Sequence, residues 1–311
     1  MFLDRLSIDR DDLDFSAIEQ LTDYRVYDRS DAGNIIDHAR DADIIISNKS
    51  KLGAVQFKLL PKLKLICVIA TGTNNIDLDA AARHGIEVVN VKDYAAASVS
   101  QHVMLLMLAL AGNFLPYQQD IRDGVWQKQD QFCLLDHPIM SLQGKTLGLV
   151  GYGHIAQAVK LKALAFDMQV IIAQSLRPYA PEQTDRLAFE QILQQSDFIS
   201  LHCPLSEFTH NLFGKREFAQ MKNTAFIINS ARGAIINEAE LLAALKSGEI
   251  AGAALDSIEH EPPAADDPII CAQLPNLIIT PHNAWATRQA RQQLVDSTAQ
   301  NIRHFLHNRD Q

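Results

Sequence analysis

A histidine, an arginine and a carboxylate, each placed after an apolar run, are the residues of this chain best suited to chemistry. His282 follows the run LIIT, Arg232 follows AFIIN, and Glu261 follows AGAAL after a short loop. A histidine can give or take a proton near neutral pH, and a carboxylate on its second ring nitrogen favours the imidazolium. Arginine offers a planar fork that matches a carboxylate and polarises a carbonyl. Together these types suit hydride transfer to a 2-keto acid, because the alkoxide formed must be protonated.

These side chains gather at one place only if the runs before them are parallel strands of one sheet. Short β-branched runs alternate with helical patterns along the chain, which is typical of βαβ units. The predicted strands are DIIIS, LKLICVIA and IEVVNV in the first third of the chain, and KTLGLV, QVIIA, DFISLH, AFIIN, AGAAL and LIIT in the remainder. In an open parallel sheet, ligands bind at the carboxyl ends of the strands. The sequence therefore predicts two α/β domains, a reactive edge on the second sheet, and one long helix from Trp285 onward.

The glycine-rich turn GYGHIA lies directly after the strand KTLGLV, begins a helical pattern, and has the form GxGxxA. Gly151 allows the tight turn, Gly153 lets the backbone approach a pyrophosphate, and the small Ala156 lets helix and strand pack closely. Phosphates would lie on the N-terminus of that helix, beside His154 and Ile155. The turn predicts a dinucleotide cofactor, with an ordinary tight turn as the alternative.

The choice between NAD(H) and NADP(H) depends on the end of the next strand, where an acidic residue usually binds the ribose hydroxyls. Here Gln174, Ser175 and Arg177 follow the strand QVIIA, and no carboxylate is present. Gln174 can bond a ribose without repelling a 2′-phosphate, and Ser175 and Arg177 can contact one. Both cofactors stay open, since Arg177 could also be a solvated loop residue. The other residues expected to line the cofactor site follow the remaining strands: Cys203, Pro204, Ser230, Ala231 and Asp256.

The composition excludes several classes of protein and partner. A chain of 311 residues that is 47% hydrophobic can bury two cores and is unlike a disordered chain. The net charge of -9 offers no field to attract nucleic acid or an anionic membrane. Four cysteines more than 60 residues apart have no metal or disulfide spacing. We expect a cytoplasmic protein without a metal, a signal peptide or a membrane span, and interpret the apolar run 103–111 as a buried helix.

Several motifs give the chain a resemblance to the D-2-hydroxyacid dehydrogenase family, and within it to the glycerate dehydrogenase and hydroxypyruvate reductase branch. They extend over most of the chain: DADIIISNK, PKLKLICVIATGTNNIDLDAA, SVSQH, LQGKTLGLVGYGHIA, DFISLHCPL, INSARGAIINEAEL, AGAALD, EPP and TPHNAWAT. The combination of ATGTNNID, SARG, EPP and PHNAW is specific, whereas the single motifs are shared more widely. The resemblance implies reduction of a short 2-keto acid, hydroxypyruvate or glyoxylate, to the D-2-hydroxy acid.

The resemblance also implies roles for particular residues. The histidine, arginine and glutamate introduced above would form the catalytic set. The backbone amides of Thr71 and Gly72 would hold the substrate carboxylate in a cleft between the domains. Asp256 would meet the nicotinamide amide, with Ser230 and Arg232 nearby through their backbone.

The implied architecture is a Rossmann-type doubly wound parallel sheet in the cofactor domain, residues 98–282, and a smaller flavodoxin-like α/β substrate domain. The substrate domain combines residues 1–97 with 283–311, so that the C-terminal helix rejoins the first third of the chain. Members commonly form homodimers through the cofactor domain, and the aromatic-rich stretch 113–132 fits that use. Neither nucleic acid nor a membrane is expected as a partner.

The chain departs from the family pattern in three places. Ala156 replaces the third glycine, Gln174 stands where NAD-specific members carry an acid, and the stretch 91–97 lacks the glycine and threonine that many relatives have. Two other functions are weighed against the main one. Formate oxidation on the same fold is disfavoured, because a carboxylate beside His282 suits protonation of an alkoxide. A nucleotide-sensing binding protein is the second alternative, and the intact histidine, arginine and glutamate argue against it.

Overall fold

The computed structural model describes residues 1–177 and 184–308, and the chain forms two compact units. The first unit comprises Met1–Ala95 and Trp285–Gln311, and the second comprises Ala96–Ala284. Residues 309–311 of the expected substrate domain lie outside the described residues. The C-terminal segment therefore belongs to the same unit as the first third of the chain.

The sheet of the first unit is parallel and its strands pair in chain order. They are β1 (Ile44–Ser47), β2 (Leu65–Val68) and β3 (Glu87–Asn90). Single-residue parallel bridges extend the sheet beyond β1, where Phe2 pairs with both Ile46 and Val26. The segments at Phe2 and Val26 can be counted as the first and second strands, followed by β1, β2 and β3 as the third to fifth. The order across the sheet is then 2-1-3-4-5, which is the flavodoxin-like order. This confirms the predicted fold of the smaller domain.

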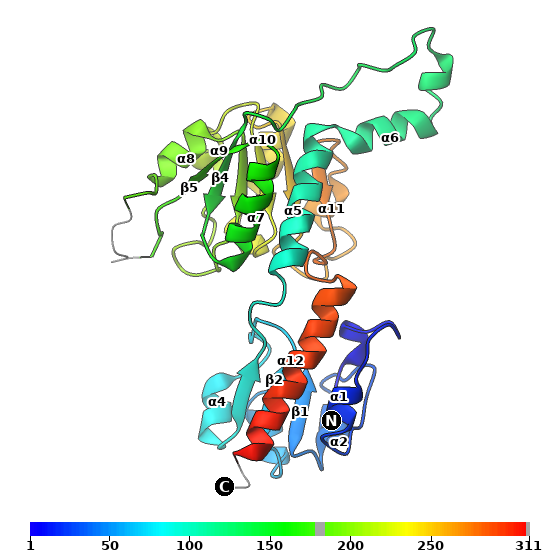
Figure 1. Ribbon diagram of the computed structural model, residues 1–311, viewed down its shortest axis with the longest axis vertical. Coiled ribbons are helices and arrows are strands. Elements are labelled where there is room, and N and C mark those ends of the chain that lie inside the picture. The colour runs from blue at the N-terminus through cyan, green and yellow to red at the C-terminus, as the bar shows by residue number, and fades with distance from the viewer. Residues whose placement is uncertain (178–183, 309–311) are drawn as a thin grey trace. The chain divides into compact units, whose positions relative to one another are not determined.

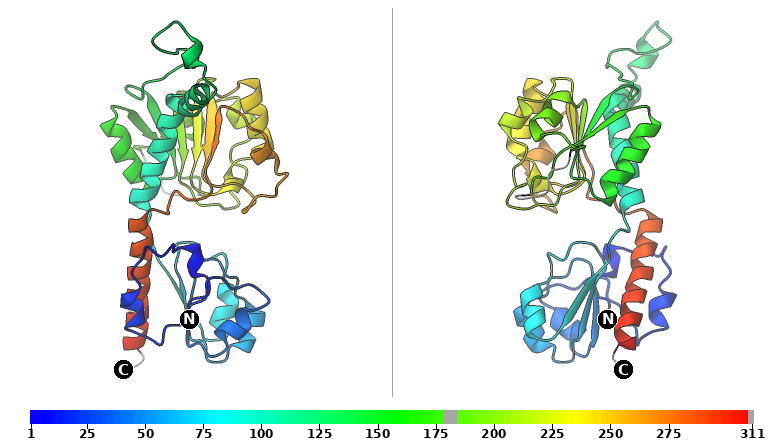
Figure 2. Two further views of the ribbon diagram at one scale, coloured as in Figure 1. Left: turned by 90° about the vertical axis from the view of Figure 1, so that its right-hand side faces the viewer. Right: turned by 60° about the vertical axis from the view of Figure 1, so that its left-hand side comes forward.

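Both faces of this sheet are covered by helices, so its strands are apolar on both sides. Ile45 and Ile66 belong to the core cluster that α3 and α4 complete, whereas Ile46 and Cys67 belong to the cluster that α1 and α12 complete. Figure 2 shows α12 along one face of the sheet. The helices of this unit are η1 (Arg5–Ser7), α1 (Ser16–Glu19), α2 (Ile35–Ala39), α3 (Ala54–Leu59), α4 (Leu78–Arg83) and α12 (Arg288–His307). The long C-terminal helix begins three residues later than predicted, because the Thr287 side chain caps it by accepting from Ala290 N.

The sheet of the second unit is parallel throughout, in the order β5-β4-β6-β7-β8-β9. Its strands are β4 (Thr146–Val150), β5 (Gln169–Ile172), β6 (Phe198–Leu201), β7 (Phe226–Asn229), β8 (Gly252–Leu255) and β9 (Leu277–Ile279). All six predicted strands are present. A parallel bridge from Ala173 to Leu187 adds one further position beside β5, which the sequence pattern missed. If β4 is counted as the first strand, β5 as the second and the segment at Leu187 as the third, the order across the sheet is 3-2-1-4-5-6-7. This is the dinucleotide-binding order with one additional strand.

This order reverses between β4 and β6, which is where a doubly wound sheet binds its ligand. Helices α5 and α7 lie side by side on one face (Figure 1). Residues of α8, α9 and α10 form the core on the other face. The helices of this unit are α5 (Ala96–Ala111), α6 (Phe114–Arg122), η2 (Trp126–Lys128), α7 (His154–Ala165), α8 (Phe189–Gln195), α9 (Lys215–Phe218), η3 (Gly233–Ile235), α10 (Glu238–Ser247) and α11 (Pro268–Cys271).

The helix over the run 103–111 is only partly buried, which corrects the sequence interpretation. Leu105 is 58% exposed and Leu108 is 42% exposed, although Val103 and Met107 on the same helix are fully buried. One face of this helix is therefore buried, and the opposite face is exposed.

Residues 113–140, called the arm below, project from the second unit (Figures 1 and 2). The left-handed Asn113, with φ of 45°, separates α5 from α6. Hydrogen bonds close the arm on itself, since Tyr117 Oη donates to His137 O and His137 Nε2 lies 2.8 Å from an Asp120 oxygen. The arm nevertheless exposes a series of apolar side chains: Phe114, Leu115, Ile121, Trp126, Phe132, Leu135 and Ile139.

In the described part of the chain, no single helix is long and apolar enough to cross a membrane. The bent pair α5 and α6, with an angle of 61° between its members, reaches the required length and composition only when both helices are counted together.

Candidate active site

A histidine and a glutamate from two neighbouring loops form a close pair. His282 Nδ1 lies 2.6 Å from Glu261 Oε2, and the two side chains are 32% and 34% exposed. Ile258 N donates to the other oxygen, Glu261 Oε1, at 3.0 Å. Since a carboxylate accepts, the hydrogen bond places a proton on Nδ1 of the imidazole. The pair has the geometry expected of an acid/base histidine oriented by a carboxylate.

A second carboxylate, that of Glu259, lies two residues before Glu261 in the same loop. Its backbone N–H donates to Glu238 Oε1 at 2.7 Å, whereas the carboxylate hydrogen-bonded to His282 is that of Glu261. Burial raises the pKa of Glu238. The loop between β8 and α11 is thus fixed at Glu259, and it presents Glu261 to the histidine.

His282 adopts an unusual backbone conformation. Its φ is 50°, in the left-handed region, and its N–H donates to Thr280 O at 2.9 Å. This conformation costs a residue with a Cβ atom about 1–2 kcal/mol. The backbone N–H groups of the next two residues, Asn283 and Ala284, both donate at 3.0 Å to the carboxylate of Asp256, which is 2% exposed. Buried contacts therefore hold the strained turn in place.

Arg232 lies on the loop after β7, and that loop packs directly against the Glu261 loop. A Cβ atom added to Gly233 would lie 1.9 Å from Ile258 C, so only glycine permits the contact. The Arg232 side chain is exposed, and its Nη1 donates to Ala231 O at 2.7 Å. The structure thus brings the arginine, glutamate and histidine loops together at the carboxyl ends of β7, β8 and β9.

The fully buried Asn229 shapes the arginine loop, and the sequence reading missed it. Its Oδ1 accepts from Ala231 N at 3.0 Å, and its Nδ2 donates to Arg232 O at 2.9 Å. The available signal was an asparagine at the end of the otherwise apolar strand AFIIN. A buried amide there requires partners, and the nearest are the backbone groups of the loop.

The glycine turn has the features needed to bind a phosphate. Gly151 has φ of 88°, and a Cβ atom on it would lie 2.5 Å from Cys203 N. On Gly153 a Cβ atom would meet no described atom within 4 Å. Gly153 also caps α7 without a side chain, so the first amides of this twelve-residue helix face outward past it. His154 and Ile155 are the first two residues of the helix.

The residues expected at the adenosine end of a dinucleotide lie at the end of β5. Gln174 and Arg177 are exposed, and Ser175 Oγ accepts from Arg177 N at 3.3 Å. Two further cations lie near this edge and were not predicted. Lys160 Nζ and Arg186 Cζ lie 5.7 and 5.4 Å from the ring centre of Tyr152, the residue between the two glycines.

After β6 the chain places His202 half-buried and Cys203 buried, whereas Pro204 is exposed. Burial raises the pKa of the Cys203 thiol to about 11, so it is not a thiolate at neutral pH. Burial also lowers the pKa of His202 to about 4, and its Nε2 lies 2.9 Å from Ser200 Oγ. Pro204 O accepts from Thr209 Oγ1 at 2.7 Å. These residues can form a wall of a cofactor site, and neither side chain suits acid/base chemistry.

The remaining expected residues differ in their surroundings. Ser230 Oγ is buried and has no hydrogen-bond partner among the described residues. Thr71 and Gly72 lie in the first unit, just beyond the carboxyl end of β2. Thr71 Oγ1 donates to Val91 O at 2.9 Å, and Thr71 O accepts from Asn90 Nδ2 at 2.7 Å. These bonds fix the turn whose amides the sequence assigned to the substrate carboxylate.

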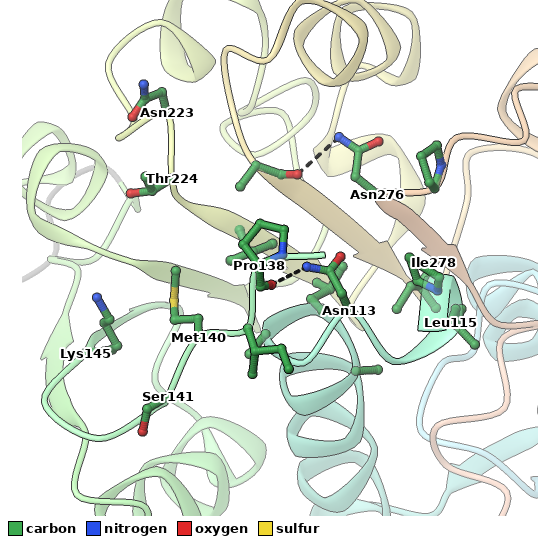
Figure 3. Close-up of a pocket in the computed structure, with 18 of the residues that line it drawn as sticks. Asn113, Leu115, Pro138, Met140, Ser141, Lys145, Asn223, Thr224, Asn276 and Ile278 are labelled. Atoms are coloured by element: carbon green, nitrogen blue, oxygen red, sulfur yellow. Dashed lines mark hydrogen bonds between the residues drawn. The ribbon is translucent and has the colours of Figure 1, made fainter. Parts of the chain in front are cut away.

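A cavity of about 640 Å³ lies at the opposite edge of the second sheet, at the amino ends of its strands (Figure 3). Asn113, Pro138 and Met140 of the arm region line it on one side, and Thr224 and Asn276 line it on the other. It contains none of the residues predicted for catalysis. Among the residues that the structure describes, no group of three or more His, Cys, Asp or Glu side chains could hold a metal ion.

The chain is similar to known proteins over most of its length. The NAD binding domain of the D-isomer specific 2-hydroxyacid dehydrogenases matches residues 104–284. Glycerate dehydrogenase of Methylorubrum extorquens is 42% identical over 98% of this chain and 95% of its own. Hydroxypyruvate reductase of Blautia hydrogenotrophica is 36% identical over the same shares of the two chains. The crystal structure of D-lactate dehydrogenase from Aquifex aeolicus, complexed with NAD and lactic acid, has a TM-score of 0.81 at 26% identity and covers 99% and 95% of the two chains.

Proposed function

Because the chain belongs to the D-isomer specific 2-hydroxyacid dehydrogenase family, an NAD-dependent family of oxidoreductases, we propose that it reduces hydroxypyruvate or glyoxylate to the D-2-hydroxy acid. The names of the two similar enzymes support this substrate class. The observation that carries the proposal is the pair of His282 and Glu261 at 2.6 Å, on a loop packed against that of Arg232. A binding protein that only senses nucleotides would have no need of an oriented proton donor.

The residues around the glycine turn fit a bound nicotinamide dinucleotide. The open space at Gly153 and the amides at the start of α7 suit the pyrophosphate, because both accept close approach of an anion. Ser230 Oγ, buried without a partner among the described residues, can bond to the nicotinamide half. Asp256 already accepts three protein hydrogen bonds, and we assign its remaining lone pair to the nicotinamide amide.

In the proposed reaction, His282 supplies the proton. A reduced nicotinamide bound at the glycine turn would supply a hydride to the keto carbon. With Nδ1 bonded to Glu261, Nε2 of the His282 imidazolium gives its proton to the carbonyl oxygen, which becomes the hydroxyl of the product. Glu261 stabilises the imidazolium and fixes the ring. In the oxidative direction, the neutral imidazole takes the proton back at Nε2.

Arg232 would bind the substrate through its carboxylate. The guanidinium has the planar geometry to bond two carboxylate oxygens and to polarise the adjacent carbonyl. Glyoxylate and hydroxypyruvate are small, so most of their binding energy must come from such charge-assisted bonds.

We further propose that the chain accepts NADP(H) as well as NAD(H). No carboxylate follows β5, and Gln174, Ser175 and Arg177 can all approach a 2′-phosphate. The cations Lys160 and Arg186 on the Tyr152 ring add positive charge near this edge. The ratio of kcat/KM for NADPH and NADH measures the preference. A ratio far below one, with no loss of NADPH use when Arg177 is replaced by alanine, would refute a role for this edge in phosphate binding.

A second copy of this chain is the partner we propose, bound through the second unit. The arm exposes Phe132 at 91% and Leu135 at 76%, and α5 exposes Leu105 at 58%. Exposed apolar side chains in such number are typical of a protein interface. The cavity between the arm and the amino ends of the strands could receive part of the second copy (Figure 3). Light scattering should give twice the chain mass, and a monomer that keeps full activity on dilution would contradict the proposal.

One experiment tests the main proposal. NADH absorbance is followed with hydroxypyruvate, glyoxylate and pyruvate for the parent enzyme, for His282→Ala and for His304→Ala, which changes an exposed histidine of α12. We expect turnover by the parent with hydroxypyruvate or glyoxylate, loss of kcat by orders of magnitude in His282→Ala, and no change in His304→Ala. NADH binding without turnover of any 2-keto acid would favour a nucleotide sensor. Near-normal turnover by His282→Ala would remove the histidine from the mechanism.

A further inference from the structure

Helix α5 contacts the loop of His282 through two side chains one helical turn apart. Ser98 Oγ donates to Ala284 O at 2.6 Å, and His102 Nε2 lies 3.0 Å from Thr280 Oγ1. Residues four apart lie on the same face of a helix. Ser98 is 5% exposed and the His102 side chain is 14% exposed. One buried face of α5 thus bonds to the chain on both sides of His282.

The directions of the hydrogen bonds can be assigned from the number of protons. Thr280 Oγ1 donates to Asp256 Oδ1 at 2.7 Å. A hydroxyl has a single proton, so its oxygen must accept from His102, and His102 therefore carries a proton on Nε2. The result is a continuous series from His102 through Thr280 to Asp256, in which each bond polarises the next.

The series ends on the backbone that follows His282. The Asp256 carboxylate accepts from Asn283 N and Ala284 N as well as from Thr280. The donors of these three hydrogen bonds lie on both sides of His282 in the chain, and the φ of His282 is 50°. Such a conformation persists only where its surroundings over-determine it. Here the surroundings are the carboxylate of Asp256 and the helix that supports it.

We propose that His102, Thr280 and Asp256 are positioning residues that hold the His282 turn and thereby aim its imidazole at the substrate. The inference rests on the proposed role of His282 as the acid/base. None of the three residues needs to exchange a proton with the substrate, and Asp256 can still accept a bond from the cofactor. Their shared task is to keep the strained turn in one conformation.

The test compares two substitutions of Thr280. Thr280→Val removes the hydroxyl and keeps the shape, whereas Thr280→Ser keeps the hydroxyl. A misplacement of about 1 Å costs about a hundredfold in rate, so kcat should fall about tenfold to a hundredfold in Thr280→Val. The substrate KM and the Kd for NADH should stay nearly unchanged, and Thr280→Ser should retain most of the parent kcat. Thr298→Val changes another buried threonine, in α12 of the other unit, and should have no effect.

A second measurement needs neither cofactor nor substrate. Hydrogen exchange at the amides of Asn283 and Ala284 should be faster in Thr280→Val than in the parent, because Asp256 loses the bond that orients it. If Thr280→Val does not fold, His102→Gln and His102→Leu replace it. The glutamine can still donate to Thr280 and the leucine cannot, so the glutamine variant should keep the larger kcat.

The outcomes separate this inference from the proposed function. An unchanged kcat in Thr280→Val, with unchanged exchange at the two amides, would overturn the inference. A raised Kd for NADH with normal kcat at saturating NADH would also overturn it, because the network would then serve the cofactor alone. His282→Ala is measured in the same series. If it keeps parent activity, the proposed role of His282 fails, whatever the Thr280 variants do.

Discussion

Gly233→Ala tests whether the packing of two loops sets the geometry of the site. A Cβ atom at this position would lie 1.9 Å from Ile258 C, 2.1 Å from Ile258 O and 2.3 Å from Glu259 N. All three are backbone atoms, so no side chain can rotate away. Ordinary contact begins at 3.4 Å, so the two loops must separate by about 1.5 Å. Because Arg232 precedes Gly233 and Glu261 follows Ile258 closely, the separation moves the arginine away from the His282–Glu261 pair.

The expected cost follows from that displacement. A shift of about 1 Å in a catalytic group costs about a hundredfold in rate, so kcat/KM for the keto acid should fall at least about a hundredfold. Overpacking also destabilises a fold by about 1–3 kcal/mol, which leaves a chain of this size folded at room temperature. NADH binding should change less than kcat/KM does, because the glycine turn at Gly151 does not take part in this contact, whereas Ser230 lies on the loop that moves.

The assay combines steady-state rates with direct binding. Rates come from NADH absorbance at varied keto acid, the Kd for NADH from fluorescence, and folding from circular dichroism. Gly153→Ala is the matched control, since its Cβ would meet no described atom within 4 Å. We expect this variant to fold normally and to lose NADH affinity, the reverse of the Gly233→Ala pattern. Parent values of kcat and KM in a folded Gly233→Ala would refute the argument that loop packing sets the catalytic geometry.

Three further predictions concern charge. Arg232→Lys keeps the charge and loses the fork, so the keto-acid KM should rise sharply, and an unchanged KM with unchanged kcat would reject its role. Glu261→Gln removes the carboxylate that accepts from His282 Nδ1 and fixes the ring, so kcat for reduction should fall, and an unchanged kcat would assign the pairing to another carboxylate. The pKa of His202 is lowered from 6.5 to about 4, so the unfolded chain takes up a proton first as pH falls. Stability should therefore decline between pH 6.5 and 4 by at most about 3 kcal/mol, and less so in His202→Gln, as acid unfolding curves would show.

The fold was predictable because its central strands are buried on both faces. Runs such as DFISLH and AFIIN are largely apolar, and the structure places every residue of β6 and β7 in the interior. The positions missed are those where pairing is reduced to one residue. Leu187 forms one bridge and Phe2 forms two, each through a single residue, and one residue leaves no periodic pattern in a sequence. Composition likewise could not show that one face of α5 is exposed.

The sequence could predict which residues lie at this edge of the sheet, but it could not predict which of them contact one another. Strand ends located Arg232, Glu261 and His282, because parallel strands bring their carboxyl ends to one edge. The choice between Glu259 and Glu261 as the partner of His282 depended on a loop that is held by Glu238 and by the contact at Gly233. Contacts of this kind join residues that are distant in sequence. The roles assigned to individual residues at this edge remain predictions.

The support of His282 shows most clearly what a single sequence hides. His102 lies 178 residues before Thr280, on a helix whose composition suggests only apolar packing. His102 is one of 11 histidines and closes the motif SVSQH, whose residue types and spacing indicate no chemistry by themselves. Its importance comes from the backbone conformation of His282, since a left-handed residue with a side chain is stable only where other groups hold it. An acid/base histidine on an exposed loop must be aimed by residues that never touch the substrate, and here those residues come from the end of β8, the end of β9 and the buried face of α5.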